Sequence, residues 1–432
     1  MLSMWQSKGK TEPSNNRQKC RQTTWQTLAC LISLSIFVVL PSTRVAHAND
    51  TIHVNSIEML RAALDDATGG ETILLTSLNY ESFDIHGYNF DDYVTIKSQD
   101  GINALFTSVD FRDSSYIRLD SLTVVASGRE AVGIFDNSHH IQVLNSTLHG
   151  VNQFDRNNLD FSQVSSLYAV NVNGDAHNLL IENNTASDAK SSAYLFTNVS
   201  DTIIRGNSCD WVASDCFKFS NADNILFENN FGAQNIHPPE GAHIDFVQGQ
   251  GAVSNSIFRG NVALMGTRSF QGLFFDDATY TNLTFENNLI YTANIRGISV
   301  SGENSSGIVA RYNTILRVAG SQKATLILIP SNSVKEFNIE GNNVTKNDQR
   351  FLNNGVIAQW DDEDDIAHYS EYYVNAMHGP FATVEDFAPV TGSLADNQFG
   401  AFARIKELLN SNPEIATPAW LIPAMMMLMS SE

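Results

Sequence analysis

The chain has 432 residues, of which 43% are hydrophobic and 17% are charged. This composition provides enough apolar residues for a large core and too few charges for a disordered protein. The 47 acidic and 26 basic residues give a net charge of -21, which argues against binding to nucleic-acid phosphates and against a basic membrane-surface domain. Only one apolar stretch approaches the length of a membrane span, so a polytopic membrane protein is excluded.

The N-terminus has the three parts of an export signal. Five basic residues precede the apolar stretch 28–40, and Ala46-His47-Ala48 then offers small residues where a signal peptidase cleaves. We expect residues 1–48 to be a signal peptide and the product to be secreted or periplasmic, with an uncleaved anchor as the alternative. Cleavage would remove six of the 26 basic residues and one of the 47 acidic residues, which leaves a net charge of -26.

Two cysteines, Cys209 and Cys216, remain after the predicted cleavage. In an oxidising compartment they could close a small disulfide loop, and two buried free thiols are the alternative.

A short phrase that alternates apolar and polar residues and ends in Asn occurs seven times. The copies lie at residues 180–184, 203–207, 226–230, 257–261, 283–288, 309–313 and 338–342. Their final Asn residues are 23, 23, 31, 27, 25 and 29 positions apart, and periods of this size indicate a stacked repeat architecture. Each phrase is too short for a helix and ends at a residue suited to a left-handed bend, so each is predicted to be a strand followed by a turn.

A second short alternating strand precedes most copies, at residues 194–196, 217–219, 244–246, 273–275 and 298–300. Two or three strands per period would wind into one coil, and stacked coils give parallel sheets with apolar ladders inside and Asn side chains bonding coil to coil. The pattern predicts an all-β chain folded as a parallel β-helix solenoid.

Both ends of the solenoid are expected to be covered. Ser56 is suited to cap a helix from residue 57 to about 67, with Met59, Leu60, Ala63 and Leu64 on one face, and a first strand follows at residues 71–75. We therefore expect a β-helix domain with an N-terminal capping helix over residues 49–350. Residues 351–432 are expected to be a loop-rich extension and cap, with an acidic loop at 361–365, a short helix at 399–409 and an apolar end at 420–429.

The helix, the Gly-Gly-Glu-Thr-Ile-Leu-Leu segment at 69–75 and the Ile-x-x-Asn ladder resemble the right-handed parallel β-helix, or pectate-lyase-like, superfamily of secreted polysaccharide-active enzymes. The resemblance covers about residues 51–345. It implies a right-handed solenoid, a monomer, a polysaccharide partner and no contact with nucleic acid, or with a membrane once the signal is removed. These motifs are specific for the fold and poor indicators of substrate.

Residues between the apolar pairs of each second strand should point outward and share one column, which reads Asn171, Leu195, Lys218, Asp245, Phe274, Ser299. Lys218 and Asp245 are thereby predicted to be neighbours on adjacent coils. The same region contains His237, His243, Arg268, Asp276 and Arg296, and it includes the longest Asn spacing, which suggests an enlarged coil beside a cleft. A set of ordinary surface hydrogen bonds and ion pairs is the alternative.

The resemblance implies cleavage of a uronate by removal of the proton at C5 and expulsion of the group at C4. Such a site needs a base, a proton donor and a cation or Arg that neutralises the carboxylate. Lys218 or His243 could be the base, and Arg268 and Arg296 could hold carboxylates. Asp245 and Asp276 could bind Ca²⁺ or orient the base. His237 and Phe274 would contact substrate, with Phe274 offering an exposed ring.

We therefore expect a lyase that acts by β-elimination on an alginate-like or pectin-like polysaccharide. Because the protein is acidic, its cleft must be locally basic or hold cations. A C5 epimerase would use the same proton abstraction, but the Asp-Pro-His-Asp motif of mannuronan epimerases is absent. A glycoside hydrolase could use Asp245 and Asp276 as its acid and base, but the Gly-His-Gly signature of galacturonase-like enzymes is also absent. A noncatalytic adhesin or tailspike-like module that grips glycans is the third alternative.

Overall fold

The computed structural model describes residues 50–150, 167–233, 244–265, 270–318, 326–330, 333–344, 353–356, 369–375 and 382–410. The predicted signal peptide, the acidic segment 361–365 and the apolar segment 420–429 lie outside these ranges. The described residues contain no helix that is long and apolar enough to cross a membrane.

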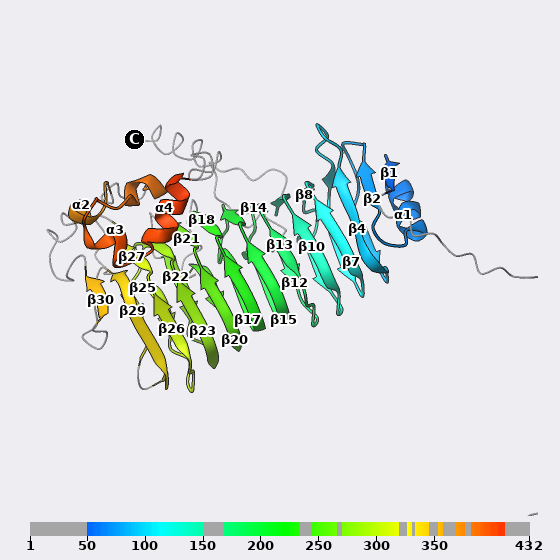
Figure 1. Ribbon diagram of the computed structural model, residues 1–432. Helices are drawn as coiled ribbons and strands as arrows, with labels where there is room; N and C mark the ends of the chain where they lie inside the picture. The colour runs from blue at the N-terminus through cyan, green and yellow to red at the C-terminus, as the bar shows by residue number, and fades with distance from the viewer. Residues whose placement is uncertain are drawn as a thin grey trace, which may run out of the picture. The chain divides into compact units, whose positions relative to one another are not determined.

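The strands form three parallel sheets that follow one another around each coil (Figure 1). Sheet 1 contains β3 (Phe83–His86), β6 (Val109–Arg112), β9 (Glu130–Phe135), β12 (Tyr168–Val172), the first parts of β15 (Ser192–Arg205) and β17 (Phe217–Glu228), β19 (Ile244–Gly249), β22 (Phe270–Phe275), β25 (Arg296–Val300) and β28 (Leu326–Leu328).

Sheet 2 contains β1 (Thr51–Val54), β2 (Thr72–Leu75), β4 (Asn89–Ser98), β7 (Ser115–Asp120), β10 (His139–Leu144), β13 (Leu180–Glu182), the second parts of β15 and β17, β20 (Val253–Arg259), β23 (Tyr280–Glu286), β26 (Ile308–Arg311) and β29 (Phe337–Val344). Sheet 3 contains β5 (Leu105–Phe106), β8 (Thr123–Val125), β11 (Thr147–His149), β14 (Thr185–Ser187), β16 (Ser208–Asp210), β18 (Phe231–Ala233), β21 (Val262–Met265), β24 (Leu289–Thr292) and β27 (Thr314–Arg317). The last strand, β30 (Asn353–Val356), pairs with β29. The predicted right-handed parallel β-helix is confirmed.

The helix α1 (Ile57–Asp66) lies at the N-terminal end of the stacked strands (Figure 1). Ser56 caps it as predicted, because its hydroxyl accepts a hydrogen bond from the backbone N–H of Met59. Leu60 and Leu64 are buried in the solenoid core, whereas Met59, which was expected on the same face, is 44% exposed.

A ladder of buried asparagines joins the coils at the turn between sheet 2 and sheet 3. From Asn207 onward, each amide oxygen accepts the backbone N–H and the side-chain N–H of the asparagine on the preceding coil; Asn207, for example, donates both to Asn230 at 3.0 and 3.1 Å. The Asn184 oxygen accepts the backbone N–H of Ser146 instead. The Asn230 amide also donates to the backbone carbonyl of Ile204 at 2.9 Å. The members are at most 1% exposed: Asn184, Asn207, Asn230, Asn261, Asn288, Asn313 and Asn342. The predicted coil-to-coil bonding by Asn is confirmed.

A second ladder of alternating Glu and Arg runs along the outer side of sheet 2. The paired positions are Glu182, Arg205, Glu228, Arg259, Glu286, Arg311 and Glu340. Arg205 Nε lies 2.7 Å from Glu182 Oε1, and the same contact recurs one pair further on between Arg259 Nη2 and Glu228 Oε2 at 2.7 Å. The ladder neutralises charge along this sheet, so the acidic excess lies elsewhere.

The residue that follows each Glu or Arg of this ladder lies in a turn, and steric contact with the preceding coil limits which residue fits there. Asn183 and Gly206 both have positive φ, 55° and 65°, which favours Asn and Gly over other residues. A Cβ added at Gly206 would clash with the Asn183 side-chain oxygen on the preceding coil. At Gly206 the asparagine of the preceding coil therefore leaves no room for a side chain.

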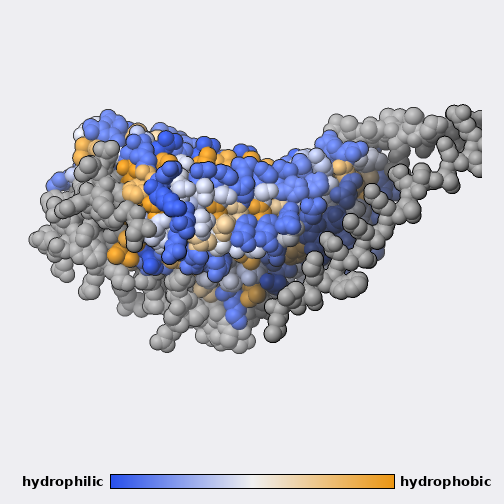
Figure 2. Space-filling model, turned by 90° about the horizontal axis from the view of Figure 1, so that it is seen from below, coloured by the Kyte–Doolittle hydropathy of each residue, from blue (hydrophilic) through white to orange (hydrophobic). Residues whose placement is uncertain are grey.

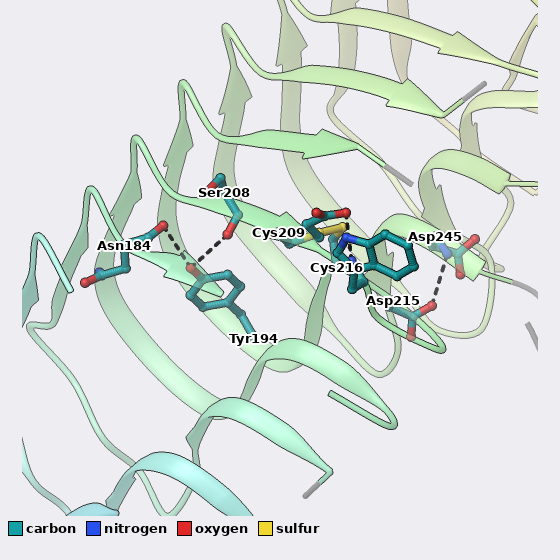
Figure 3. Close-up of a disulfide and its surroundings, with 9 residues drawn as sticks. Asn184, Tyr194, Ser208, Cys209, Asp215, Cys216 and Asp245 are labelled. Atoms are coloured by element: carbon teal, nitrogen blue, oxygen red, sulfur yellow. Dashed lines mark hydrogen bonds between the residues drawn. A yellow bond between two sulfur atoms is a disulfide. The ribbon is translucent and has the colours of Figure 1, made fainter. Parts of the chain in front are cut away.

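A disulfide between Cys209 and Cys216 spans the corner that leads from sheet 3 to sheet 1 (Figure 3). Both cysteines are at most 1% exposed, and of the two alternatives left by the sequence, a disulfide and two free thiols, the disulfide is the one found. The corner ends at Phe217, where β17 begins, so the bond restrains the segment immediately before Lys218.

The C-terminal segment packs along the side of the solenoid, on the outer face of sheet 3. It contains α2 (Tyr369–Tyr372), the short 3₁₀ helix η4 (Val384–Phe387), α3 (Leu394–Asn397) and α4 (Phe402–Asn410), of which α4 was predicted at 399–409. Phe387 packs edge-on against Tyr291 of β24, and Arg404 Nε donates to the carbonyl of Gly260 at 2.8 Å. This cover leaves sheet 1 free of the C-terminal helices. Figure 2 shows a face on which hydrophilic residues predominate, with hydrophobic residues interspersed.

We expect Asn230→Ala to lower the free energy of unfolding by about 2–4 kcal/mol, because it leaves the Asn207 N–H and the Ile204 carbonyl buried without their partner. Asn338→Ala is the matched control, since Asn338 is exposed in β29 and its loss should change stability by less than about 0.5 kcal/mol. Urea denaturation of both variants measures the difference, and equal midpoints would contradict the role given to the ladder.

Replacing both Cys209 and Cys216 with Ala should lower the free energy of unfolding by about 2–3 kcal/mol, because the closed loop is short. Dithiothreitol should lower the denaturation midpoint of the parent protein and leave that of the double variant unchanged. If the parent is equally insensitive to the reductant under conditions in which a thiol assay shows the bond reduced, the disulfide does not stabilise the corner.

Candidate active site

The outward residues of sheet 1 form one column that runs across nine coils. Strand register places them in the order Asp84, Asp110, Gly133, Asn171, Leu195, Lys218, Gln248, Phe274 and Ser299. We call this set the sheet 1 column. Adjacent members are separated by about 4.8 Å, the spacing between paired strands.

The predicted pairing of Lys218 with Asp245 is wrong. Lys218 pairs with Gln248, and Asp245 pairs with Gln271 on the following coil. The cause lies in β19, where Phe246 and Val247 are adjacent and both fully buried, so the alternation that should fix the register is broken. Val247, and not Ile244, pairs with Phe217.

Lys218 nevertheless has a carboxylate beside it. Its Nζ lies 3.9 Å from Asp215 Oδ2, and the Lys218 side chain is 24% exposed while that of Asp215 is 3% exposed. Asp215 also accepts the backbone N–H of Asp245 at 3.1 Å, which ties the two coils together next to the disulfide (Figure 3). The amine is therefore held by a buried acid and reaches solvent.

Arg296, the first residue of β25, is held by three groups. Its guanidinium donates to Gln271 Oε1 at 3.1 Å, lies 3.7 Å from Asp276 Oδ2 and covers the ring of Phe274 at 4.7 Å. Ser299 fixes Asp276 in turn, by donating to its Oδ1 at 2.9 Å. The Arg296 side chain remains 38% exposed, against 13% for Asp276, so the cation is the solvent-facing member of the pair.

Phe274 lies in the column as predicted, but its ring is not an open platform. It is only 5% exposed, because Arg296 lies over its face. The expectation of an exposed aromatic ring is therefore wrong. Phe274 instead supports the guanidinium, which is the group that a ligand would meet.

Lys218 and the Arg296 guanidinium lie within reach of one short oligosaccharide. The guanidinium covers Phe274, which is two coil steps, or about 10 Å, from Lys218 along the column. Between them lies Gln248, which is 6% exposed. The chemistry offered to a ligand is thus one amine and one guanidinium, each positioned by a less exposed carboxylate.

Asp245 and Asp276 do not form a pair. Asp245 is level with Gln271, so Asp276 is displaced by five residues along the neighbouring strand, which is about 16 Å. This distance is too long for two ligands of one Ca²⁺ and for the acid and base of a glycoside hydrolase. The described residues also contain no group of three or more His, Cys, Asp or Glu side chains arranged to hold a metal. We derive no step through Ca²⁺.

The N-terminal part of the column contains acidic residues that the sequence reading missed. Asp110 lies beside Gly133, and Glu130, three residues earlier in β9, accepts a hydrogen bond from the Asn171 amide at 3.1 Å. Burial and the nearby negative charges of Glu130 and Asp84 raise the pKa of Asp110 to about 6. The outward position of Asp110 between buried Val109 and Phe111 is the signal that could have identified it.

Gln248 and Gln271 were also absent from the predicted site. Asp215 stands three residues before Lys218, where the disulfide corner brings its side chain back toward the amine. The two glutamines could be found only with the correct register of β19. His237, His243 and Arg268, which were predicted to belong to the site, lie outside the described residues.

A family model described as "Right handed beta helix region" matches residues 85–315. No curated protein matches the chain. Among solved structures, the chain is similar to the pectate lyase Pel9A, with 14% identity, a TM-score of 0.40 and coverage of 66% of this chain and 78% of that one.

Two further structures have comparable similarity. The PL6 family alginate lyase AlyGC has 13% identity and a TM-score of 0.44, with coverage of 69% of this chain and 48% of that one, so the chain spans about half its length. PfbA, a surface adhesin of Streptococcus pneumoniae, has 12% identity and a TM-score of 0.43, with coverage of 67% and 81%. Similarities this distant carry no conclusion about activity. The family match extends over more than half of the chain and agrees with the observed coils, so the protein belongs to the right-handed β-helix family.

Proposed function

We propose that the protein is a polysaccharide lyase that cleaves a uronate-containing polysaccharide by β-elimination in the sheet 1 column. The observation that carries the proposal is the placement of Lys218 and Arg296. In a chain with a large acidic excess, these two cations are the exposed members of neighbouring contacts, while their carboxylate partners are more deeply buried.

The elimination assigns one task to each cation. Arg296 would bind the uronate carboxylate, which makes the proton at C5 more acidic by stabilising the negative charge that develops when it leaves. Lys218 would act as the base that accepts that proton. The electron pair of the C5–H bond then forms the C4–C5 double bond, the bond from C4 to the leaving oxygen breaks, and Lys218 returns the proton that it accepted to that oxygen.

The surrounding residues would act by positioning these groups. Asp215 restrains the Lys218 amine, while Gln271 and Asp276 set the direction of the guanidinium over Phe274. Gln248 lies between the two cations and is suited to hydrogen-bond a sugar hydroxyl. His243 as an alternative base, and Arg268 and His237 as further substrate contacts, remain predictions, as does a requirement for Ca²⁺.

Lys218→Met should reduce kcat on the best uronate polymer by at least about a hundredfold, because it removes the base while keeping the length of the side chain. Arg296→Gln should reduce kcat/KM by roughly tenfold to a hundredfold through loss of the charged contact. The matched control is Lys190→Met, since Lys190 is an exposed lysine in the turn before β15 and should be dispensable. Thermal melts verify that all three variants fold.

The assay follows the ultraviolet absorbance of the unsaturated uronate product on a panel of alginate and pectin polymers, with and without a chelator. Reducing ends without this absorbance would indicate a hydrolase, and binding without either would indicate a noncatalytic module. If Lys218→Met and Arg296→Gln retained full turnover while the parent made unsaturated product, the class would stand and the location of the site would be wrong.

A further inference from the structure

The charge of the sheet 1 column changes along its length. At one end the cations Lys218 and Arg296 are more exposed than their carboxylate partners, and at the other end four carboxylates and two guanidinium groups lie in or beside the column. The members of this acidic end are Asp84, Asp110, Glu130 and Asp136, with Arg112 and Arg129.

The two arginines of the acidic end offset two of its four carboxylates, which leaves a net charge of about -2 when Asp110 is ionised. Arg112 lies between Asp84 and Asp136, at 3.6 and 3.4 Å, and so is shared by two acids. Arg129 is 3.8 Å from Glu130, but its side chain is 61% exposed and lies over the ring of Tyr168. The Glu130 side chain is only 13% exposed, so Arg129 is the more exposed member of this pair, and the excess of acid comes from Asp84, Asp110 and Asp136.

The distance between the two ends is set by the register. Asp110 lies four coil steps from Lys218, about 19 Å, and the coil of Glu130 lies three steps away, about 14 Å. These distances exceed the Debye length of about 8–10 Å at ordinary salt, so the acids have little effect on Lys218 itself. Asp110 and Glu130 would instead repel any substrate carboxylate that extends over them.

We propose that Asp110 and Glu130 end the uronate-binding part of the column, so that the protein favours uronates that are next to uncharged sugars or to a chain end over long uninterrupted polyuronate. This inference rests on the proposed function and specifies its substrate class. A short oligouronate fits over Lys218, Gln248, Phe274 and Ser299, a span of about 14 Å. A longer homopolymer would place carboxylates beside the acidic end, where Leu195 and Asn171 offer no cation.

The inference requires that Asp110 is charged at neutral pH. The pKa of Asp110 is about 6 in the folded protein, above its ordinary value of 3.8. Between these two values the folded protein binds more protons than the unfolded chain, so the free energy of unfolding falls as the pH rises through this range. The full cost of ionising Asp110 is present above about pH 6. Asp110→Asn, which keeps an acceptor for the Gly133 N–H, should therefore raise the melting temperature by roughly 2 °C at pH 7.5 and by less at pH 4. Asp100→Asn, an exposed control, should show no such pH dependence. A gain at pH 4 as large as at pH 7.5 would contradict the charge.

The decisive experiment measures binding of a uronate trisaccharide and of a long polyuronate to the full mature chain by calorimetry. The test variant combines Asp110→Asn with Glu130→Gln, and the control combines Asp100→Asn with Glu303→Gln, which removes two exposed carboxylates from connecting turns. The test variant should bind the long polymer roughly threefold to tenfold more tightly than the parent does, with less than twofold change for the trisaccharide. The control should match the parent, and the gain should disappear at about 1 M salt.

The outcomes separate this inference from the proposed function. One outcome would overturn only the role of Asp110 and Glu130. In this outcome the parent binds and cleaves uronates, and the test variant discriminates between the trisaccharide and the long polymer as the parent does. An equal gain in the control variant would also overturn it, because net charge would then explain the effect. A parent that binds neither ligand overturns the proposed function and this inference together.

Discussion

The buried asparagine ladder is the constraint on which the rest of the structure depends. Each amide satisfies backbone groups of the adjacent coils, so a shift of one coil against the next would leave several buried polar groups without partners. Coils of 23 to 31 residues can therefore stack in one register, and the differences in length are absorbed by the turns. This register is what brings Lys218, Gln248 and Phe274, from three separate coils, into one column.

The repeat also indicates where function is located. On sheet 2 the outward charges alternate as Glu and Arg for seven coils, and each Arg is taken up by a neighbouring Glu. On sheet 1 the outward positions follow no such rule, and Lys218 and Arg296 contact carboxylates that lie off the column. Because the ladder of sheet 2 leaves few groups for a ligand, the irregular column of sheet 1 is the better candidate for binding.

Much of the fold could be predicted from the sequence, because alternation and Asn spacing report directly on strands and turns. The α1 cap, the strand positions and the coil-to-coil asparagines were predicted correctly. The site could be predicted only in part. Its register depends on β19, where adjacent Phe246 and Val247 remove the alternation, and the burial of Phe274 depends on an arginine from the next coil. Contacts between side chains on different coils cannot be inferred from the pattern of one strand.

An acidic protein that binds an acidic polymer needs local exceptions to its overall charge. Asp215 and Asp276 hold Lys218 and Arg296 in place while being less exposed than they are, so a ligand meets the cations first. The remaining acidic surface acts over only about one Debye length in salt, which permits binding over a few coils. The same acidity becomes unfavourable once a polyanion extends toward Asp110 and Glu130, because carboxylates outnumber guanidinium groups there. The same distribution of charge therefore explains where along the solenoid a uronate polymer binds and how far along it the polymer can extend.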